Sequence, residues 1–332
     1  MHNKVDILEN EIIEQYPEVL DILLRDHTTQ KNIFWGTENY EQLGQEYSFE
    51  APILANLITG KRGDLIMPRV QKDSITQHSR VKKMAEVFTP SWICNAQNNL
   101  IDNSWFERKD VFNKEIPDEK KWKTNYEKIK FSNNKTWKHY IRDKRLEMAC
   151  GEAPYITSRY DTTTGVFISI QDRIGLLDRK LRVINENVSL SREWLRAAQI
   201  AYKSTYAYEW QGDSLLLARE TMLFTFIENY KFKFNKEPLL KSVKSIAQII
   251  SWNVWQMDGL KGVVPNSCKT INTSTEILFG IEEIKSSPCI GCQKDEITNH
   301  NGKYCLIKDW QSRDLITKKI GKKIRFIDLI KK

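Results

Sequence analysis

The sequence predicts a mixed α/β fold, with a helix-rich region at residues 1–83, a central α/β domain at 84–262 and a small cysteine-rich region at 263–332. Three observations carry this prediction. One central segment is typical of a strand that enters a tight turn, and a second is typical of a strand that ends in an acid before a helix. Four cysteines follow residue 263. The length of 332 residues suggests about two domains.

The first 83 residues are predicted to be helical because apolar residues recur there at helical spacing. These residues are Leu8, Ile12, Leu20 and Leu23. Loops are expected at Gly60–Asp64 and at Pro68. The N-terminal sequence has no basic segment followed by an apolar one, and no stretch approaches the roughly 20 apolar residues of a membrane span. We therefore expect a cytoplasmic protein with no membrane partner.

The segment Leu146–Ile156, LEMACGEAPYI, is predicted to run from a strand through a tight turn into a helix. Gly151 lies where the backbone must turn sharply and approach a ligand closely, which a residue without Cβ does at the lowest cost. The acid Glu147 could hold the amino group of a methionine moiety. An ordinary turn between a strand and a helix is the alternative.

This segment resembles the first motif of the amino-methylating DNA methyltransferases, written D-P-A-C-G-S-G-x-F-L. The shared residues are Glu147, the triplet Ala149-Cys150-Gly151, and the pair Tyr155-Ile156. The second glycine of the motif is replaced by Ala153, so the turn is less permissive here. The resemblance implies a binding loop for S-adenosyl-L-methionine that includes Glu147, Cys150, Gly151, Ala153 and Tyr155.

Two further segments resemble methyltransferase motifs on either side of this loop. Upstream, Ala85–Pro90 is similar to the E-V/F-F/Y-T-P element, so Phe88, Thr89 and Pro90 become cofactor candidates, although a simple helix start at Thr89-Pro90 is the alternative. Downstream, Tyr206–Glu220 is similar to the second motif, a strand that ends in an acid and then a helix. The resemblance places Glu209 on the ribose hydroxyls and Trp210 beside it.

The distance from Gly151 to Glu209 is much longer than the roughly 20 residues of a dinucleotide fingerprint. The intervening chain is predicted to contain a short strand at Gly165–Ile170 and a helix, because an apolar stripe follows helical spacing. That stripe is Ile174, Leu177, Leu181 and Ile184. Further on, Ile249–Leu260 resembles the third motif, a strand followed by x-D-x-L. The resemblance implies that Asp258 accepts the adenine amine of the cofactor, and a surface aspartate in a turn is the alternative.

Together, the four segments between Ala85 and Leu260 resemble the modification subunits of restriction-modification systems, in the γ arrangement of DNA adenine methyltransferases. The implied fold is a Rossmann-like S-adenosylmethionine-dependent methyltransferase domain. The catalytic motif N-P-P-Y is absent, because none of the nine prolines is next to another. The chain is therefore expected to provide no catalytic residue, and to transfer methyl groups to DNA only with a companion chain that carries that motif.

The cysteines give an independent signal. Cys289 and Cys292 form a C-x2-C pair with Gly291 inside it, and a pair of this spacing presents two thiolates to one tetrahedral ion. The predicted zinc ligands are Cys268, Cys289, Cys292 and Cys305. His300 is an alternative to Cys268. Unliganded thiols and a redox pair remain as other interpretations, although no thioredoxin-like context surrounds the pair.

The charge balance agrees with a DNA partner. Lys plus Arg number 51 and Asp plus Glu 43, which gives a net charge of +8, and the densest basic run is Thr317–Arg325. A non-catalytic methyltransferase-fold module that binds DNA or cofactor is the alternative function. A nuclease is a third, but Pro117–Lys121 is better explained as an exposed charged turn than as a metal-dependent cutting site.

Overall fold

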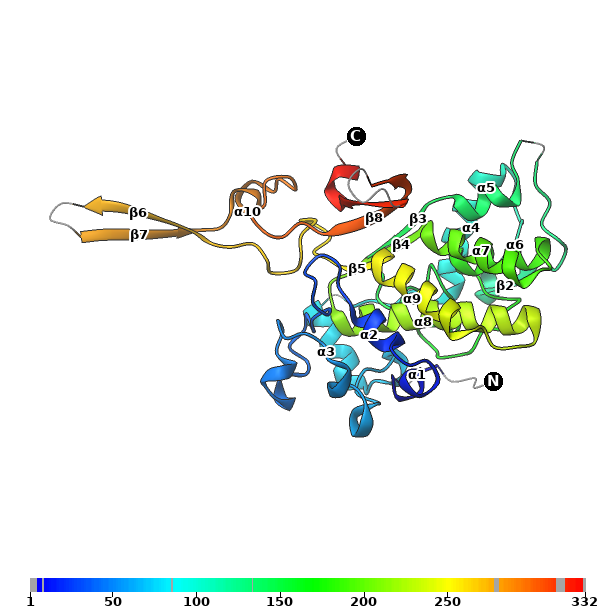
Figure 1. The fold of residues 1–332 in the computed structure, drawn as a ribbon, viewed down its shortest axis with the longest axis horizontal. Coiled ribbons are helices and arrows are strands. Elements are labelled where there is room, and N and C mark those ends of the chain that lie inside the picture. The colour runs from blue at the N-terminus through cyan, green and yellow to red at the C-terminus, as the bar shows by residue number, and fades with distance from the viewer. Residues whose placement is uncertain are drawn as a thin grey trace.

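A computed structural model describes residues 5–7, 9–84, 86–132, 134–277, 281–314 and 320–330. Within these residues the protein is a mixed α/β structure with several small sheets (Figure 1). A long hairpin extends away from a helical body, and a short parallel sheet lies between that body and the C-terminal strands. Leu8, Ala85 and Thr317–Lys319, which the sequence predictions included, lie outside the described residues.

The central sheet has three parallel strands in the order β3-β4-β5. Their bounds are Arg145–Met148 for β3, Thr205–Glu209 for β4 and Val254–Gln256 for β5. A pair of helices follows each of the first two strands, because parallel strands require long crossovers. These helices are α6 (Leu176–Asn187), α7 (Ser191–Lys203), α8 (Gly212–Phe234) and α9 (Leu240–Asn253).

The two faces of this sheet are covered differently. Side chains alternate along a strand, and the register pairs Leu146 with Tyr206 and Tyr208 with Trp255. On that face Tyr208 and Trp255 pack against the C-terminal hairpin of β8 (Leu306–Arg313) and β9 (Ile320–Arg325) through a small apolar cluster. The opposite face, which includes Ala207 and Val254, belongs to the main core with α8 and α9.

The N-terminal region packs into the same main core as the helices around the sheet, through residues such as Ile12, Leu20 and Trp35. Its α-helices lie at its two ends, at α1 (Glu9–Gln15), α2 (Val19–Leu24) and α3 (Ser74–Met84). Short 3-10 turns occupy the intervening chain at Glu41–Leu43, Gln45–Tyr47, Ala55–Leu57, Gly60–Arg62 and Arg69–Gln71. The predicted helical character therefore holds for only part of this region.

Helix α4 (Ser91–Phe106) begins directly after Pro90, as predicted. It is joined to α6 by a buried ion pair in which Arg179 Nη1 lies 2.6 Å from Asp102 Oδ2. The same guanidinium donates hydrogen bonds to Asn95 and Asn99 of α4. Hydrogen bonds of this kind are stronger in a low-dielectric interior than in water, so the network attaches α6 firmly to α4. The following elements are β1 (Asn113–Ile116), a 3-10 turn at Pro117–Glu119, β2 (Lys121–Thr124) and α5 (Trp137–Arg142).

Three local predictions are wrong. No helix follows the turn after β3, because Gly151 and Ala153 have φ of 52° and 60°, which is incompatible with a right-handed helix. Gly165–Ile170 forms only one bridge, Tyr160 to Phe167, because Asp161 holds the preceding backbone in a turn through Thr163 and Thr164. The residues 249–253 end helix α9, so the third strand begins only at Val254.

The C-terminal part contains a projecting hairpin and a compact base. The hairpin consists of the antiparallel strands β6 (Ile271–Ile277) and β7 (Ile281–Ser287). At its base lie α10 (Ile290–Lys294) and the β8–β9 hairpin, which ends in a 3-10 turn at Phe326–Leu329. Among all the residues that the structure describes, no helix combines the length and the apolar character needed to cross a bilayer.

Candidate cofactor cavity and metal centre

The carboxyl ends of β3 and β4 meet at one edge of the sheet, as they must in a parallel pair, and a cavity of about 160 Å³ lies there. The residues that line it come from the segment after α3 and from the turns after β3 and β4. Of the residues that the sequence predicted for the cofactor, seven line this cavity: Phe88, Thr89, Glu147, Cys150, Gly151, Tyr155 and Glu209.

The turn after β3 is built on left-handed backbone positions. Ala149, Gly151 and Ala153 have φ of 48°, 52° and 60°. A Cβ at Gly151 would lie 3.7 Å from the Phe88 ring, so the glycine brings the backbone close to this aromatic wall. A non-glycine residue in this conformation costs roughly 1 kcal/mol. Ala153 therefore adopts a glycine-type conformation at the position where the methyltransferase motif has glycine.

Glu147 is buried at the base of this turn. Its carboxylate accepts hydrogen bonds from the backbone N–H groups of Ile156 and Tyr155, at 3.1 and 3.3 Å. Burial nevertheless raises the pKa of Glu147 to about 8, and the neighbouring Glu209 adds to this rise. The side chain consequently gains a proton below pH 8. A cation that reached this carboxylate would favour its ionised form.

Glu209, the last residue of β4, ties the two turns together. One oxygen accepts the N–H of Gly151 at 2.8 Å, and the other accepts the N–H groups of Trp210 and Gln211 at 2.8 and 3.2 Å. Burial raises the pKa of Glu209 in spite of these donors. A direct hydrogen bond within the protein thus joins Glu209 to the loop of Gly151, a contact that the sequence prediction did not include.

The other predicted cofactor residues do not line this cavity within the described part of the chain. Pro90 precedes α4, Ala153 is fully buried in the turn, and Trp210 contributes a backbone carbonyl that accepts a hydrogen bond from Gln256. Asp258 follows β5 in a tight turn, where it accepts the N–H of Leu260 at 3.0 Å and lies 3.4 Å from Lys261 Nζ. Its position matches the turn aspartate considered as the alternative interpretation.

A buried ion cluster that no sequence pattern predicted lies beside the cavity. Asp213, in the first turn of α8, pairs with Arg80 Nη1 at 2.8 Å and lies 3.6 Å from Lys72 Nζ. These cations hold the pKa of Asp213 well below its usual value although burial opposes them. Arg80 also pairs with the cavity residue Glu86. The cluster attaches α3 to the cavity wall across 133 residues of sequence, a separation that local patterns do not detect.

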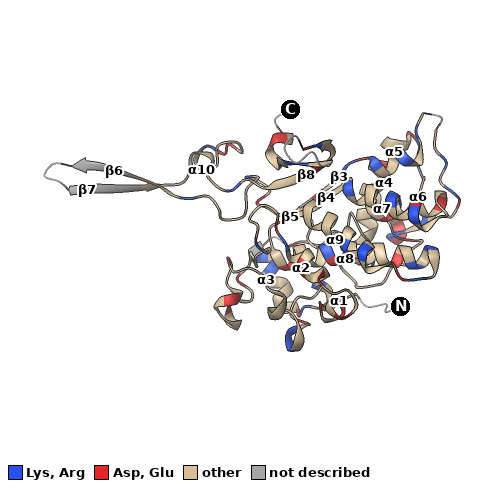
Figure 2. Ribbon diagram, viewed as in Figure 1, with Lys and Arg blue, Asp and Glu red and all other residues tan. Residues whose placement is uncertain are grey.

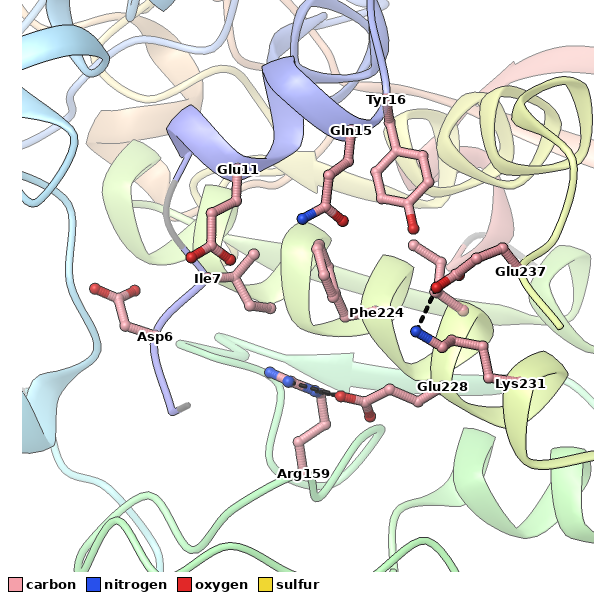
Figure 3. A pocket seen from close by; sticks show the side chains of 11 residues that line it. Asp6, Ile7, Glu11, Gln15, Tyr16, Arg159, Phe224, Glu228, Lys231 and Glu237 are labelled. Carbon is pink, nitrogen blue, oxygen red and sulfur yellow. Dashed lines mark hydrogen bonds and ion pairs between the residues drawn. The ribbon is translucent and has the colours of Figure 1, made fainter. Parts of the chain in front are cut away.

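A separate cavity of about 270 Å³ lies between α1 and α8 (Figure 3). Two of its acids pair with cations that also line it: Arg159 Nη2 lies 2.7 Å from Glu228, and Lys231 pairs with Glu237. None of the residues that resemble a methyltransferase motif lines it. We therefore assign these two ion pairs to the attachment of the Arg159 segment, and of the segment after α8, to α8.

Near the C-terminus, Cys268, Cys289, Cys292 and His300 form a group that could hold a metal ion. Their ligand atoms all lie within 4.8 Å of one another. His300 Nδ1 lies 3.7, 3.6 and 3.6 Å from the three sulfur atoms. Tetrahedral zinc with usual Zn–S and Zn–N bond lengths places sulfur and nitrogen about 3.6 Å apart. The donor set and its spacing are therefore compatible with zinc.

Two glycines allow the backbone to pack closely against these side chains. A Cβ at Gly291 would lie 2.7 Å from His300 Nδ1, and one at Gly302 would lie 3.0 Å from Cys268 Sγ. Backbone N–H groups of Asn301 and Cys292 lower the pKa of Cys289 to about 6, which favours its thiolate. Burial and the neighbouring thiols of Cys289 and Cys292 raise the pKa of Cys268 to about 12. A bound cation would offset the repulsion between the negatively charged thiolates.

The prediction of Cys305 as the fourth ligand is wrong, and His300 takes that place. Cys305 is buried in the apolar cluster with Tyr208 and Trp255, and its Sγ lies 3.4 Å from the carbonyl oxygen of Gln256. Burial raises the pKa of this thiol well above its ordinary value. Spacing along the chain could not separate the two candidates, because packing of the segment after Tyr304 on the central sheet removes Cys305 from the group.

Comparisons with protein-family models, curated proteins and solved structures gave no match for this chain.

Proposed function

We propose that this chain is the S-adenosyl-L-methionine-binding subunit of a split DNA adenine methyltransferase in a restriction-modification system. The single observation that carries the proposal is the position of Glu147, Gly151 and Glu209 around one cavity at the carboxyl edge of parallel strands. In open α/β sheets ligands bind outside the carboxyl ends of the strands. The proposal also assigns a Rossmann-like methyltransferase fold to the region around β3, β4 and β5.

The cofactor would supply an electrophilic methyl group on sulfur. Glu147, once ionised, would pair with its methionine ammonium group, and Glu209 would accept from the ribose hydroxyls. The left-handed turn at Gly151 lets the backbone approach closely beside Phe88. Glu209 would have to exchange at least one backbone donor for a ribose hydroxyl. Asp258 does not line the cavity. Its contact with the adenine amine is therefore supported by the sequence resemblance alone.

The acceptor half of the reaction is assigned to a companion chain. No Pro-Pro step exists in this sequence to hold a flipped base. In addition, β3 is an edge strand among the described residues, and on that strand Leu146 and Met148 are 43% and 67% exposed. Strands of parallel sheets are normally covered on both faces. These features support a companion that carries N-P-P-Y and pairs its first strand with β3.

The metal in the C-terminal group is proposed to be zinc, held by Cys268, Cys289, Cys292 and His300. Four protein ligands leave no open position, which is typical of a structural site. The base of the long hairpin has few buried apolar residues other than those that contact the sheet. Zinc would therefore fix the geometry of this base and would not take part in methyl transfer.

The cofactor assignment predicts a pH-dependent affinity. Because the pKa of Glu147 is about 8, the carboxyl must lose a proton to pair with an ammonium group. Affinity for S-adenosyl-L-methionine should therefore rise by up to about tenfold per pH unit between pH 6 and pH 7, where the ammonium group of the cofactor stays charged. Calorimetric titration across this range, alone and with the companion, measures the slope.

Glu147→Gln should weaken binding and abolish this slope. Glu152→Gln is the matched control, because Glu152 is also buried with a raised pKa but does not line the cavity. It should keep the slope of the wild-type protein. A wild-type affinity that does not change with pH, or no binding with or without the companion, would contradict the assignment.

A non-catalytic module that binds DNA or cofactor is the second candidate. One observation favours it: the Glu209 oxygens already accept three backbone N–H groups, so the carboxylate is satisfied without a ligand. Under this alternative, cofactor binding could persist while a companion restores no methyl transfer. Methyl transfer to DNA by the two chains together would support the first candidate, and its absence would support the second.

A further inference from the structure

The largest of the cavities described lies apart from the candidate cofactor cavity. It is a groove of about 660 Å³ between two segments that are distant in sequence, one after α2 and the other beside the metal group. The first wall includes Lys31, Asn32 and Phe34. The second wall comes from residues 264–267, from Lys269 and from residues 301–303.

The charge of this groove is concentrated and positive. Among the described residues that line it, Lys31, Lys269 and Lys303 are exposed lysines, and Glu50 is the acidic residue. Elsewhere on the body, basic and acidic residues are interspersed (Figure 2). A groove with three lysines on opposite walls attracts a polyanion more strongly than an interspersed surface does.

The metal group holds one wall of the groove in place. Lys269 follows the ligand Cys268, and Asn301 follows the ligand His300. The Lys269 backbone and the Asn301 amide exchange two hydrogen bonds of 2.9 and 2.8 Å. The N–H of Lys303 donates to Ser267 Oγ at 3.0 Å. The backbone of two of the three lysines is thus held by hydrogen bonds next to the candidate metal ligands.

The opposite wall is also anchored. The backbone N–H of Phe34 donates to Gln256 Oε1 at 3.0 Å, and its carbonyl accepts from Nε2 of the same amide at 2.8 Å. Gln256 is the last residue of β5. The backbone at the half-buried Phe34 is therefore anchored to the central sheet, three residues after Lys31.

We propose that this groove binds the phosphodiester backbone of duplex DNA, with Lys31, Lys269 and Lys303 contacting phosphates. Lysine is a flexible point charge suited to phosphate contacts that do not depend on base sequence. The inference rests on the proposed function, because it names the surface that holds the DNA substrate.

The test measures binding of a 20-base-pair duplex by fluorescence anisotropy over a range of salt concentrations. The variant Lys31→Ala/Lys269→Ala/Lys303→Ala should lower the slope of log K against log salt by roughly 2 to 3, since each phosphate contact contributes about 0.9. At about 0.1 M salt its Kd should be at least about tenfold weaker.

A matched control removes the same charge elsewhere. Lys114, Lys123 and Lys128 are exposed on or beside the β1–β2 hairpin, and their triple alanine variant should keep the wild-type slope. Equal slopes for the wild-type and groove variants, equal losses in both variants, or no duplex binding by the wild-type protein would each overturn the inference. Unchanged cofactor binding and zinc content in the groove variant would show that it is folded and that the cofactor proposal stands separately.

Discussion

Cys292→Ser is expected to release the metal ion, whereas Cys305→Ser is expected to leave it bound. The first side chain belongs to the group around His300, and the second is buried against the central sheet. A structural zinc site contributes roughly 10 kcal/mol or more to the folding of the segment that it holds. Loss of one ligand should therefore loosen residues after about 263 while the helical body stays folded.

Elemental analysis of protein prepared without chelator should find about one zinc per chain in the wild-type and Cys305→Ser proteins. His300→Ala should behave like Cys292→Ser and contain none. Limited proteolysis should cut the metal-free variants first in the C-terminal region. If His300→Ala kept its zinc and Cys305→Ser lost it, the ligands would be the four cysteines. A wild-type protein that contained no zinc would show that this group does not bind the metal.

Met148→Asp is expected to prevent association with the companion chain. Met148 lies on β3, an edge strand among the described residues, where it is 67% exposed and also lines the candidate cofactor cavity. If a companion strand and its following helix cover this position, the substitution buries an unpaired carboxylate, which costs several kcal/mol. The affinity between the chains should fall at least about a hundredfold, equivalent to roughly 2.8 kcal/mol. Analytical ultracentrifugation of the co-expressed chains measures this change.

Leu190→Asp is the control for this experiment. Leu190 is also an exposed apolar residue, at 64%, but it precedes α7 on a different part of the body. The same apolar-to-charged change there should leave the association intact. Full association of the Met148→Asp chain would show that β3 is not the contact, and an equal loss in both variants would mean that the effect is not local.

The sequence was most informative where a local pattern determines the structure. The strand that ends in Glu209 and the helix after it are present as β4 and α8, because apolar residues, an acid and a helix start follow one another without interruption. The start of α4 after Pro90 is correct for the same reason. The tight turn at Gly151 is also present, and its glycine has the left-handed conformation that its role requires.

Tertiary contacts determine the features that the sequence did not reveal. Arg80 and Asp213 pair across 133 residues, and Cys305 is separated from His300 by the packing of the chain on β5. The turn after β3 has no helix because Gly151 and Ala153 adopt left-handed φ, and the carboxylate of Glu147 accepts the backbone N–H groups of the residues that follow. Each of these outcomes depends on partners that a local pattern cannot identify.

The most direct test of the central claim is transfer of radiolabelled methyl groups from S-adenosyl-L-methionine to DNA by this chain, by the companion, and by both together. The companion to use is a chain that carries N-P-P-Y and is encoded by the neighbouring reading frame. Methylation should appear only when both chains are present, and Glu147→Gln should reduce it. Robust transfer by this chain alone, or none by the two chains together, would contradict the account.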